Sequence, residues 1–201
     1  MIKVISLDLD GTLVDTLPIH RSAFCKAVYD LHKLKIDDTY HDQYLKGLPT
    51  VEKIKRLISF AELPKNIDIS DIIERKNKYA TLFIESLRPN QMLNKMLFEM
   101  SESYIFTCVT NTNKEFALMT LRNIHLHDLF DLIITGSDLK HLKPHKEPYL
   151  RLRDNYLLME MKEFLIVEDS EEGCKSAKSA GFKNIWKVNG TTDVLNLKSQ
   201  L

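Results

Sequence analysis

The sequence predicts an α/β fold, a Rossmann-like parallel sheet with helices on both faces and a small all-helical segment inserted after the first strand. Three observations support this prediction. The chain opens with a β-branched run at residues 2–7, residues 17–87 show helical periodicity alone, and alternating strand and helix patterns follow residue 88. Strands that alternate with helices indicate a parallel sheet that is covered on both faces. We therefore expect one domain from residues 1–16 and 88–201 and a second, helical domain from residues 17–87.

The first predicted strand, at residues 2–7, is apolar and rich in β-branched residues, which is typical of a buried parallel strand. It ends before Asp8, and Gly11 permits a turn that other residues resist. In residues 17–87 the apolar side chains recur at helical spacing, with breaks at residues 47–49 and at Pro64. The insertion is thus predicted to contain about four short helices and no strand.

The remaining elements alternate along the rest of the chain. Strands are expected at residues 104–109, 132–135, 164–167 and 184–188, and helices at residues 114–122, 146–158 and 171–180. Gly181 is a typical C-terminal stop for the last of these helices. Together with the first strand, these elements predict one sheet of five parallel strands.

Composition excludes several classes of protein. The 201 residues are 44% hydrophobic and 28% charged with a formal net charge of +0, so no global field attracts nucleic acid or an anionic membrane. No apolar run is long enough to span a bilayer or to act as a signal peptide. We therefore expect a cytoplasmic protein without nucleic-acid or membrane partners, present as a monomer or a weak homo-oligomer.

The cysteines argue against thiolate chemistry. Cys25, Cys108 and Cys174 lie far apart in the sequence and form no CxxC pair. A disulfide framework or a thiolate metal site is therefore not expected, which agrees with a reducing compartment.

Polar residues follow four of the predicted strands at their carboxyl ends or in the next loop. They are Asp8 and Asp10 after the first strand, Thr110 and Asn111 after the second, Lys143 in the loop after the third, and Glu168 and Asp169 after the fourth. In open parallel sheets, ligands bind beyond the carboxyl ends of the strands. We therefore expect these four segments to converge on one site.

The residue types at this predicted site suit phosphoryl transfer. Asp8, Asp10 and Asp169 crowd negative charge, which requires protonation or a bound cation. Oxygen ligands without clustered His or Cys favour a hard ion, and Mg²⁺ commonly binds carboxylates together with a substrate phosphate. Lys143 and the Thr110 hydroxyl can bind the phosphoryl oxygens, helped by backbone N–H groups at the start of the next helix. A carboxylate is also a competent nucleophile toward phosphorus.

Four sequence motifs carry a family resemblance. Asp8-Leu-Asp-Gly-Thr-Leu-Val-Asp-Thr16 resembles the first motif of the haloacid-dehalogenase-like hydrolases, Thr110-Asn111 the second, Lys143-Pro144 the third and Val167-Glu-Asp-Ser-Glu-Glu-Gly173 the fourth. They occur in the family's order and spacing over nearly the whole chain. The helical insertion resembles the cap of the phosphoglycolate-phosphatase and β-phosphoglucomutase-like branch, in which the cap would close over the site and select substrates.

The resemblance implies a Mg²⁺-dependent phosphatase that hydrolyses a small phosphorylated metabolite through an aspartyl-phosphate intermediate. Asp8 would attack phosphorus, and Asp10 would protonate the leaving group and then activate water. Mg²⁺ would bind the Asp8 side chain, the backbone carbonyl of Asp10, and Asp169, with Glu168 nearby. The phosphoryl group would be bound by Thr110, Asn111 and Lys143, of which Lys143 is also catalytic.

Several residues keep a second interpretation. Asp15 is equally suited to capping the first inserted helix or to supporting catalysis. Lys140 and Lys146 are alternatives to Lys143 in a lysine-rich loop, and Lys146 occupies a position where relatives usually carry a second proline. In the predicted cap, His20 and Thr50 are candidates for substrate contact, although a half-exposed helix histidine is an equal alternative for His20.

His141 and His145 have the spacing of helical zinc ligands. Pro144 interrupts the helix between them, which excludes a zinc site of this kind.

Three other functions fit parts of this pattern. A phosphosugar mutase of the same branch typically carries an arginine shortly after the glycine of the cap loop, whereas Gly47 is followed by Leu48, Pro49 and Thr50, so hydrolysis is favoured. A dehalogenase would not need Asp10 as an acid and base. A receiver-type phosphate-accepting domain has no helical insertion of this size.

Overall fold

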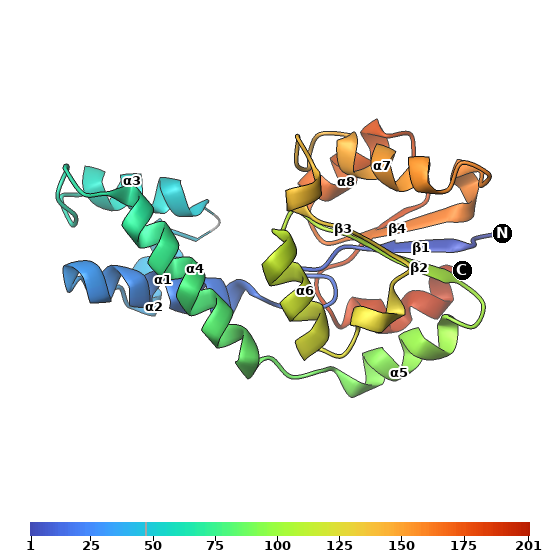
Figure 1. Cartoon of the computed structure of the whole chain (residues 1–201), viewed down its shortest axis with the longest axis horizontal. Coiled ribbons are helices and arrows are strands. Elements are labelled where there is room, and N and C mark those ends of the chain that lie inside the picture. The colour runs from blue at the N-terminus through green and yellow to red at the C-terminus, as the bar shows by residue number, and fades with distance from the viewer. Residues whose placement is uncertain (47) are drawn as a thin grey trace. The chain divides into compact units, whose positions relative to one another are not determined.

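The computed structural model describes residues 1–46 and 48–201 and divides into two compact units. Met1–Thr16 and Leu87–Leu201 form the first, called here the sheet unit, and Leu17–Ser86 form the second, called the helical unit. Figure 1 shows the elements of both units in chain order. Gly47, on which the expectation about a cap-loop arginine depends, lies outside the described residues.

The sheet unit contains five parallel strands in the order β3-β2-β1-β4-β5. The strands are β1 (Val4–Leu7), β2 (Ile105–Val109), β3 (Leu132–Ile134), β4 (Phe164–Glu168) and β5 (Ile185–Lys187). Every predicted strand is present within one or two residues of its expected ends. The predicted fold class, a Rossmann-like parallel sheet with an inserted helical segment, is confirmed.

Helices cover both faces of the sheet (Figure 1). One face carries α5 (Gln91–Met100), α6 (Lys114–Asn123) and a C-terminal 3₁₀ segment (Asp193–Gln200), whose apolar side chains pack with those of alternate strand residues such as Leu7. The other face carries α7 (Glu147–Asn155) and α8 (Glu171–Ser179), which pack with the intervening strand residues such as Val4. Both sets of strand side chains are therefore buried, as expected for a parallel sheet.

Helix α5 and the C-terminal 3₁₀ segment were not predicted from the sequence. The Asn90 side chain caps α5 by accepting the N–H of Leu93 at 3.1 Å. Leu93, Leu97 and Met100 then recur at helical spacing and face the core. Both signals are present in the sequence. Short 3₁₀ segments also occur at Ile84–Ser86, His127–Leu129, Gly136–Asp138 and Met161–Glu163.

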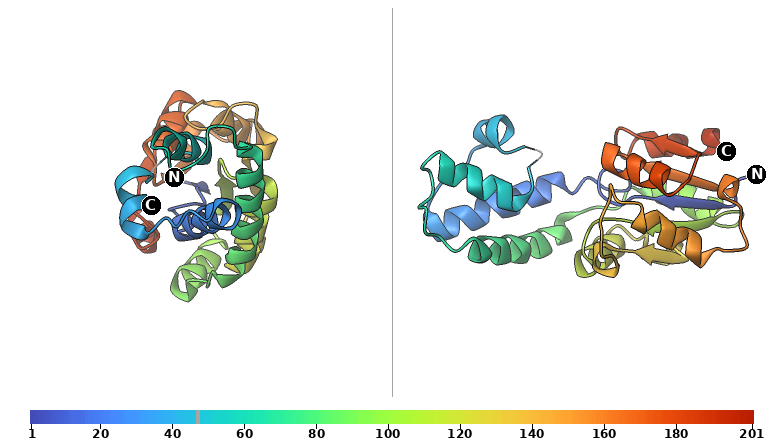
Figure 2. Two further views of the ribbon diagram at one scale, coloured as in Figure 1. Left: turned by 90° about the vertical axis from the view of Figure 1, so that its left-hand side faces the viewer. Right: turned by 90° about the horizontal axis from the view of Figure 1, so that it is seen from above.

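The helical unit contains the four predicted helices. They are α1 (Leu17–His32), α2 (Asp38–Tyr44), α3 (Thr50–Ser59) and α4 (Ile69–Phe83), and the described residues of this unit include no strand. Helices α1 and α4 lie side by side (Figure 2). The Tyr79 hydroxyl of α4 donates a hydrogen bond to the Asp30 carboxylate of α1. Buried apolar residues such as Phe24 and Leu57 give the unit its own core.

None of the helices in the described part of the chain is both long enough and apolar enough to cross a membrane.

Candidate active site

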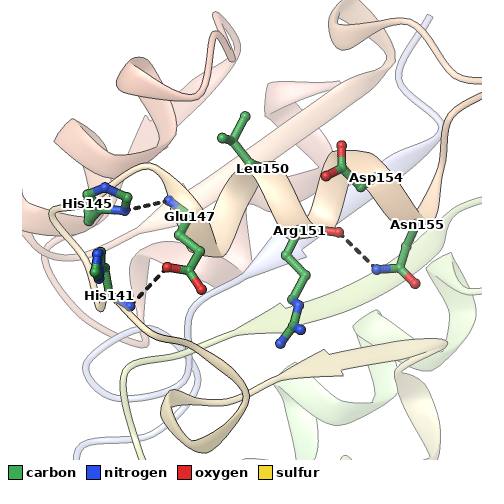
Figure 3. A pocket seen from close by; sticks show the side chains of 7 residues that line it. All are labelled: His141, His145, Glu147, Leu150, Arg151, Asp154 and Asn155. Carbon is green, nitrogen blue, oxygen red and sulfur yellow. Dashed lines mark hydrogen bonds between the residues drawn. The ribbon is translucent and has the colours of Figure 1, made fainter.

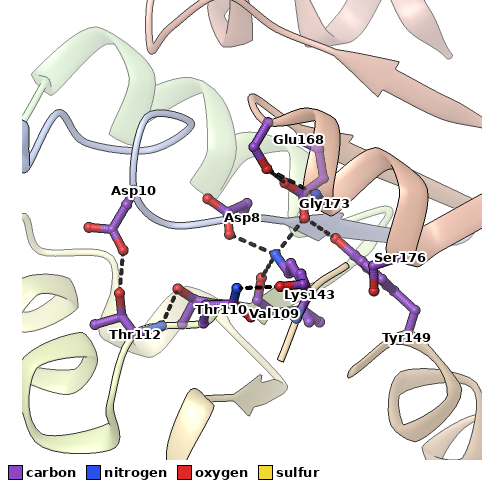
Figure 4. Close-up of polar contacts among 12 residues, drawn as sticks. Asp8, Asp10, Val109, Thr110, Thr112, Lys143, Tyr149, Glu168, Gly173 and Ser176 are labelled. Atoms are coloured by element: carbon purple, nitrogen blue, oxygen red, sulfur yellow. Dashed lines mark hydrogen bonds and ion pairs between the residues drawn. The ribbon is translucent and has the colours of Figure 1, made fainter. Parts of the chain in front are cut away.

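The central strand brings the predicted site residues to one edge of the sheet. Leu7 at the end of β1 pairs with Cys108 of β2 on one side and with Val167 of β4 on the other. The residues that follow these three positions therefore emerge at neighbouring carboxyl ends, where the strand order reverses direction. Figure 4 shows the resulting group of polar side chains.

Lys143 is the centre of this group. Its side chain is buried, and Nζ donates hydrogen bonds to Asp8 Oδ1 at 2.7 Å, to the Val109 carbonyl at 2.6 Å and to Glu168 Oε1. Burial alone would lower the pKa of Lys143, but the carboxylates of Asp8 and Glu168 outweigh it and raise that pKa well above its usual value. The ammonium therefore stays charged between two acids.

The lysine-rich loop offers one lysine to the site. Lys140 and Lys146 are both exposed, whereas Lys143 is only 7% exposed and contacts two carboxylates. The structure therefore brings Lys143, rather than either alternative, to the predicted site. The Lys143–Pro144 peptide bond is cis.

Asp8 directly follows β1 and is buried. Burial raises its pKa well above the usual value, although the charge of Lys143 opposes this shift, and the nearby carboxylates of Glu168 and Asp10 raise the pKa further. Ionised Asp8 therefore depends on positive charge close to it. Lys143 provides one such charge.

Both oxygens of Asp10 accept hydrogen bonds from threonine hydroxyls. Oδ1 accepts from the Thr16 hydroxyl. Oδ2 accepts from the Thr112 hydroxyl at 2.5 Å, as Figure 4 shows. The Thr112 backbone N–H in turn bonds the hydroxyl oxygen of buried Thr110 at 3.1 Å. Thr112 was not among the predicted site residues, since its position two residues after Thr110 carried no separate signal.

Asn111 also reaches the site, with its side chain bonded to the protein. Its Oδ1 accepts the backbone N–H of Lys143 at 2.8 Å, and its Nδ2 donates to the Lys143 carbonyl at 3.1 Å. The amide thus positions the lysine loop. A contact between Asn111 and a phosphoryl group stays a prediction.

Three carboxylates form a group that fits a metal ion. Oxygen atoms of Asp8, Glu168 and Asp169 lie within 4.8 Å of one another. Burial, followed by the charge of Glu168, raises the pKa of Asp169. This all-oxygen donor set, with more negative charge than Lys143 alone offsets, suits a hard divalent cation such as Mg²⁺.

Gly11 allows Asp169 to occupy this position. Its φ is +85°, as the predicted turn requires, and a Cβ added there would lie 2.1 Å from Asp169 Oδ2. The glycine is therefore needed both for its backbone conformation and for the close approach of the acidic residue.

Glu168 is held from several sides. The hydroxyl of Tyr149, from α7, donates to Glu168 Oε1, and both side chains are fully buried. Burial, and then the charge of Glu168, raises the pKa of Tyr149 well above its usual value, so the hydroxyl keeps its proton. Tyr149, six residues after Lys143, was also absent from the predicted site.

The remaining candidates are not part of this group. Asp15 is exposed, and His20 and Thr50 belong to the helical unit, where both side chains are partly buried. His141 and His145 are exposed, with ring centroids 4.5 Å apart, and neither belongs to the acidic group described above.

The two histidines line a surface pocket beside α7, shown in Figure 3. Glu147 in this pocket accepts the backbone N–H groups of Lys140 and His141 at 2.9 and 3.0 Å, so its carboxylate organises the loop.

Comparisons with known proteins agree with the fold. A crystal structure of a candidate β-phosphoglucomutase from Thermotoga maritima aligns with a TM-score of 0.82 at 23% identity and covers 100% of both chains. The structure of CbbY from Rhodobacter sphaeroides in complex with phosphate aligns with a TM-score of 0.73 at 23% identity, covering 94% of this chain and 87% of that one.

Sequence relatives include several phosphatases. A phosphorylated carbohydrates phosphatase from Thermotoga maritima is 28% identical over 189 residues, 92% of this chain and 85% of the relative. A phosphoglycolate phosphatase from Nitrosospira multiformis is 27% identical, covering 90% and 80%. A β-phosphoglucomutase from Bacillus subtilis is 24% identical, covering 89% and 80%.

The family model described as haloacid dehalogenase-like hydrolase matches residues 5–187, which includes all four motifs and the inserted helices. The predicted family and the prediction that the chain is an enzyme are both confirmed. The chain belongs to the haloacid dehalogenase-like hydrolase family.

Proposed function

We propose that this protein is a Mg²⁺-dependent phosphatase that hydrolyses a small phosphorylated carbohydrate through an aspartyl-phosphate intermediate on Asp8. The observation that carries the proposal is the buried contact between Lys143 Nζ and Asp8 Oδ1, at 2.7 Å, beside a group of three carboxylates. A nucleophilic carboxylate and a fixed cation at one point suit attack on a phosphate dianion.

In the first step, an oxygen of Asp8 attacks phosphorus and the bond between phosphorus and the leaving oxygen breaks. Asp10 donates its proton to that oxygen, and the dephosphorylated alcohol departs. The hydroxyls of Thr16 and Thr112 fix the Asp10 carboxyl for this transfer. Lys143 stays protonated and offsets charge on Asp8 and on the transferring oxygens.

In the second step, Asp10 removes a proton from water, and the resulting hydroxide attacks the phosphorus of the aspartyl phosphate. The bond between phosphorus and the Asp8 oxygen breaks, which releases inorganic phosphate and restores both carboxyl groups. One residue thus serves first as acid and then as base, as in other two-step hydrolyses.

We infer that Asp8 and Asp169 hold the metal, with Glu168 adjacent. Bound Mg²⁺ would reduce the repulsion between the nucleophile and the phosphoryl oxygens. The raised pKa values of Asp8 and Asp169 support a cation here, because ionising both carboxyls in a buried group requires added positive charge.

The proposed substrate class follows from the names of the relatives, which include a phosphorylated carbohydrates phosphatase and phosphoglycolate phosphatases. We expect residues of the helical unit to select among such substrates, with His20 and Thr50 as the first candidates. A cytoplasmic location also stays a prediction.

The proposal is tested by phosphate release from a panel of sugar phosphates and phosphoglycolate, with and without Mg²⁺. The wild-type protein should release phosphate only with the metal, and Asp8→Asn should lower kcat by about 1000-fold or more because the nucleophile is lost. Asp154→Asn, an exposed carboxylate on α7, serves as the control and should keep wild-type activity. Wild-type turnover by Asp8→Asn would contradict the mechanism.

A phosphosugar mutase is the rival within the family, and β-phosphoglucomutases are among the relatives. We favour hydrolysis because Gly47 is followed by Leu48, Pro49 and Thr50, whereas the mutases typically carry an arginine shortly after the glycine of the cap loop to bind a second phosphate. The same panel decides between them, since conversion of one sugar phosphate into its isomer without phosphate release would identify a mutase.

A further inference from the structure

Tyr149 lies beside the predicted catalytic lysine and shares a hydrogen-bond acceptor with it, although it is outside the four motifs described above. Its hydroxyl donates to Glu168 Oε1, the same oxygen that accepts from Lys143 Nζ (Figure 4). Its ring also lies beside the ammonium, with Nζ 5.4 Å from the ring centroid. Aromatic faces attract cations at this range, more strongly where water is excluded.

The other oxygen of the Glu168 carboxylate, Oε2, also has close neighbours. Ser170 Oγ lies 3.4 Å from Oε2, and a Cβ added at Gly173 would lie 1.9 Å from the same oxygen. The carboxylate therefore occupies the space that a side chain at position 173 would fill, next to the start of α8. On its other side, Oε1 accepts from the Tyr149 hydroxyl, and the same oxygen is one of the three acceptors of Lys143 Nζ.

Core packing alone does not explain a tyrosine at this place. The Tyr149 ring packs edge-on against Phe182 at a centroid distance of 6.0 Å, a role that phenylalanine would serve equally. A fully buried hydroxyl is costly unless it is hydrogen-bonded, and here its acceptor is a buried carboxylate. The hydroxyl is thus the part of the residue that points to the site.

We propose that Tyr149 is a positioning residue for Lys143, with its hydroxyl fixing Glu168 Oε1 and its ring flanking the ammonium, so that Nζ is held against Asp8. This inference rests on the proposed function, in which Lys143 offsets charge on Asp8 during phosphoryl transfer. It also assigns Glu168 Oε1 to the lysine rather than to the metal.

Tyr149→Phe tests the hydroxyl because the ring, and with it the core packing, is retained. With p-nitrophenyl phosphate and saturating Mg²⁺, we expect kcat to fall about tenfold, as for other residues that orient a reacting group through a second residue. KM and the Mg²⁺ concentration for half-maximal activity should change by less than about twofold, since the hydroxyl is fully buried and bonded to Glu168 Oε1.

Tyr156→Phe is the matched control. The Tyr156 hydroxyl also donates to a carboxylate, Asp131 Oδ2, at 2.5 Å. Tyr156 directly follows α7, the helix that contains Tyr149, but it lies outside the acidic group of Asp8, Glu168 and Asp169. The kcat of Tyr156→Phe should equal that of the wild type. A kcat for Tyr149→Phe within twofold of wild type would overturn the proposal. So would a tenfold rise in the Mg²⁺ requirement, because the hydroxyl would then serve the metal.

A second readout does not depend on turnover. In protein labelled with ¹⁵N-lysine, the Lys143 ammonium should give a correlation signal that exchanges slowly because the group is buried, and its absence in Lys143→Arg assigns it. Tyr149→Phe should shift or broaden this signal, while Tyr156→Phe leaves it unchanged. An unshifted signal in Tyr149→Phe contradicts the inference. If the wild-type protein hydrolyses no phosphate ester, the proposed function is contradicted. The Lys143 signal would still show whether Tyr149 positions the ammonium, because the spectrum does not depend on turnover.

Discussion

The side-chain amide of Asn111 holds the backbone of Lys143 through two hydrogen bonds. Oδ1 accepts the Lys143 N–H at 2.8 Å, and Nδ2 donates to the Lys143 carbonyl at 3.1 Å. One residue from the end of β2 thus fixes both backbone polar groups of a residue in the loop after β3. The Lys143 side chain can then extend between Asp8 and Glu168.

Asn111→Ala should therefore weaken catalysis more than it weakens folding. We expect kcat to fall by about 10- to 100-fold, because the lysine loop loses its anchor. Asn111 is exposed, so water can replace the lost bonds and the melting temperature should change little. Steady-state kinetics and thermal unfolding measure the two effects.

Asn155→Ala is the control for this change. Asn155 is also exposed and donates to the Arg151 carbonyl at 2.9 Å, away from the acidic group. Equal losses of kcat in the two variants would contradict the positioning role of Asn111.

Lys143→Met should abolish activity and also destabilise the sheet unit. Removing the ammonium leaves the buried carboxylates of Asp8 and Glu168 without their cation, which typically costs about 3–5 kcal/mol when one partner of a buried pair is lost. Urea unfolding at neutral pH measures the free energy. Lys140→Met removes an exposed lysine from the same loop and should match the wild type in both assays. An undiminished unfolding free energy in Lys143→Met would exclude a buried ion pair.

Gly11→Ala should impair the metal site. The backbone at Gly11 has φ +85°, and the new Cβ would lie 2.1 Å from Asp169 Oδ2, so the acidic residue must move. We expect a Mg²⁺ requirement raised by about tenfold or more, in line with losses seen when the surroundings of a metal site are disturbed. Activity as a function of Mg²⁺ concentration provides the measurement.

Gly190→Ala separates this steric effect from backbone strain. Gly190 also has a positive φ, +141°, but a Cβ there would meet nothing within 4 Å. Both variants should lose about 1–3 kcal/mol of stability from the unfavourable backbone conformation. The Mg²⁺ requirement should rise for Gly11→Ala alone, and a rise in both would assign the effect to strain.

His41 should make the helical unit less stable in mild acid. Burial, followed by the nearby charge of Lys53, lowers the pKa of His41 below 6.5 in the folded protein. Its Nε2 lies 3.1 Å from Lys53 Nζ, so the neutral ring accepts this hydrogen bond. As the pH falls, the unfolded chain binds the proton first, and protonation therefore favours unfolding.

Urea unfolding at about pH 7 and about pH 5 tests this expectation, since the unperturbed histidine titrates between them. The wild type should lose stability on acidification, and His41→Gln should lose less. His141→Gln, which removes an exposed histidine, should behave as the wild type does. An identical decline in His41→Gln and the wild type would show that other groups cause it.

The sequence by itself determined the fold class and picked out most of the polar residues that the fold brings together. The β-branched runs, the helical periodicity of residues 17–87 and the polar residues at strand ends are local patterns, and each is legible without coordinates. Parallel strands also align their carboxyl ends, so Asp8, Thr110 and Glu168 could be expected at one edge. Helix α5, in contrast, was missed although its cap and periodicity are present in the sequence.

The tertiary structure decided which side chains touch. Lys143, rather than Lys140 or Lys146, reaches Asp8, and Tyr149 and Thr112 join the site through contacts that span many residues of sequence. Loop conformation and side-chain direction follow from packing across the whole sheet, and no local pattern encodes them. The same physical reason explains Asn111. Its residue type suggested a phosphate ligand, but the fold places its amide against the Lys143 backbone, where it positions the lysine.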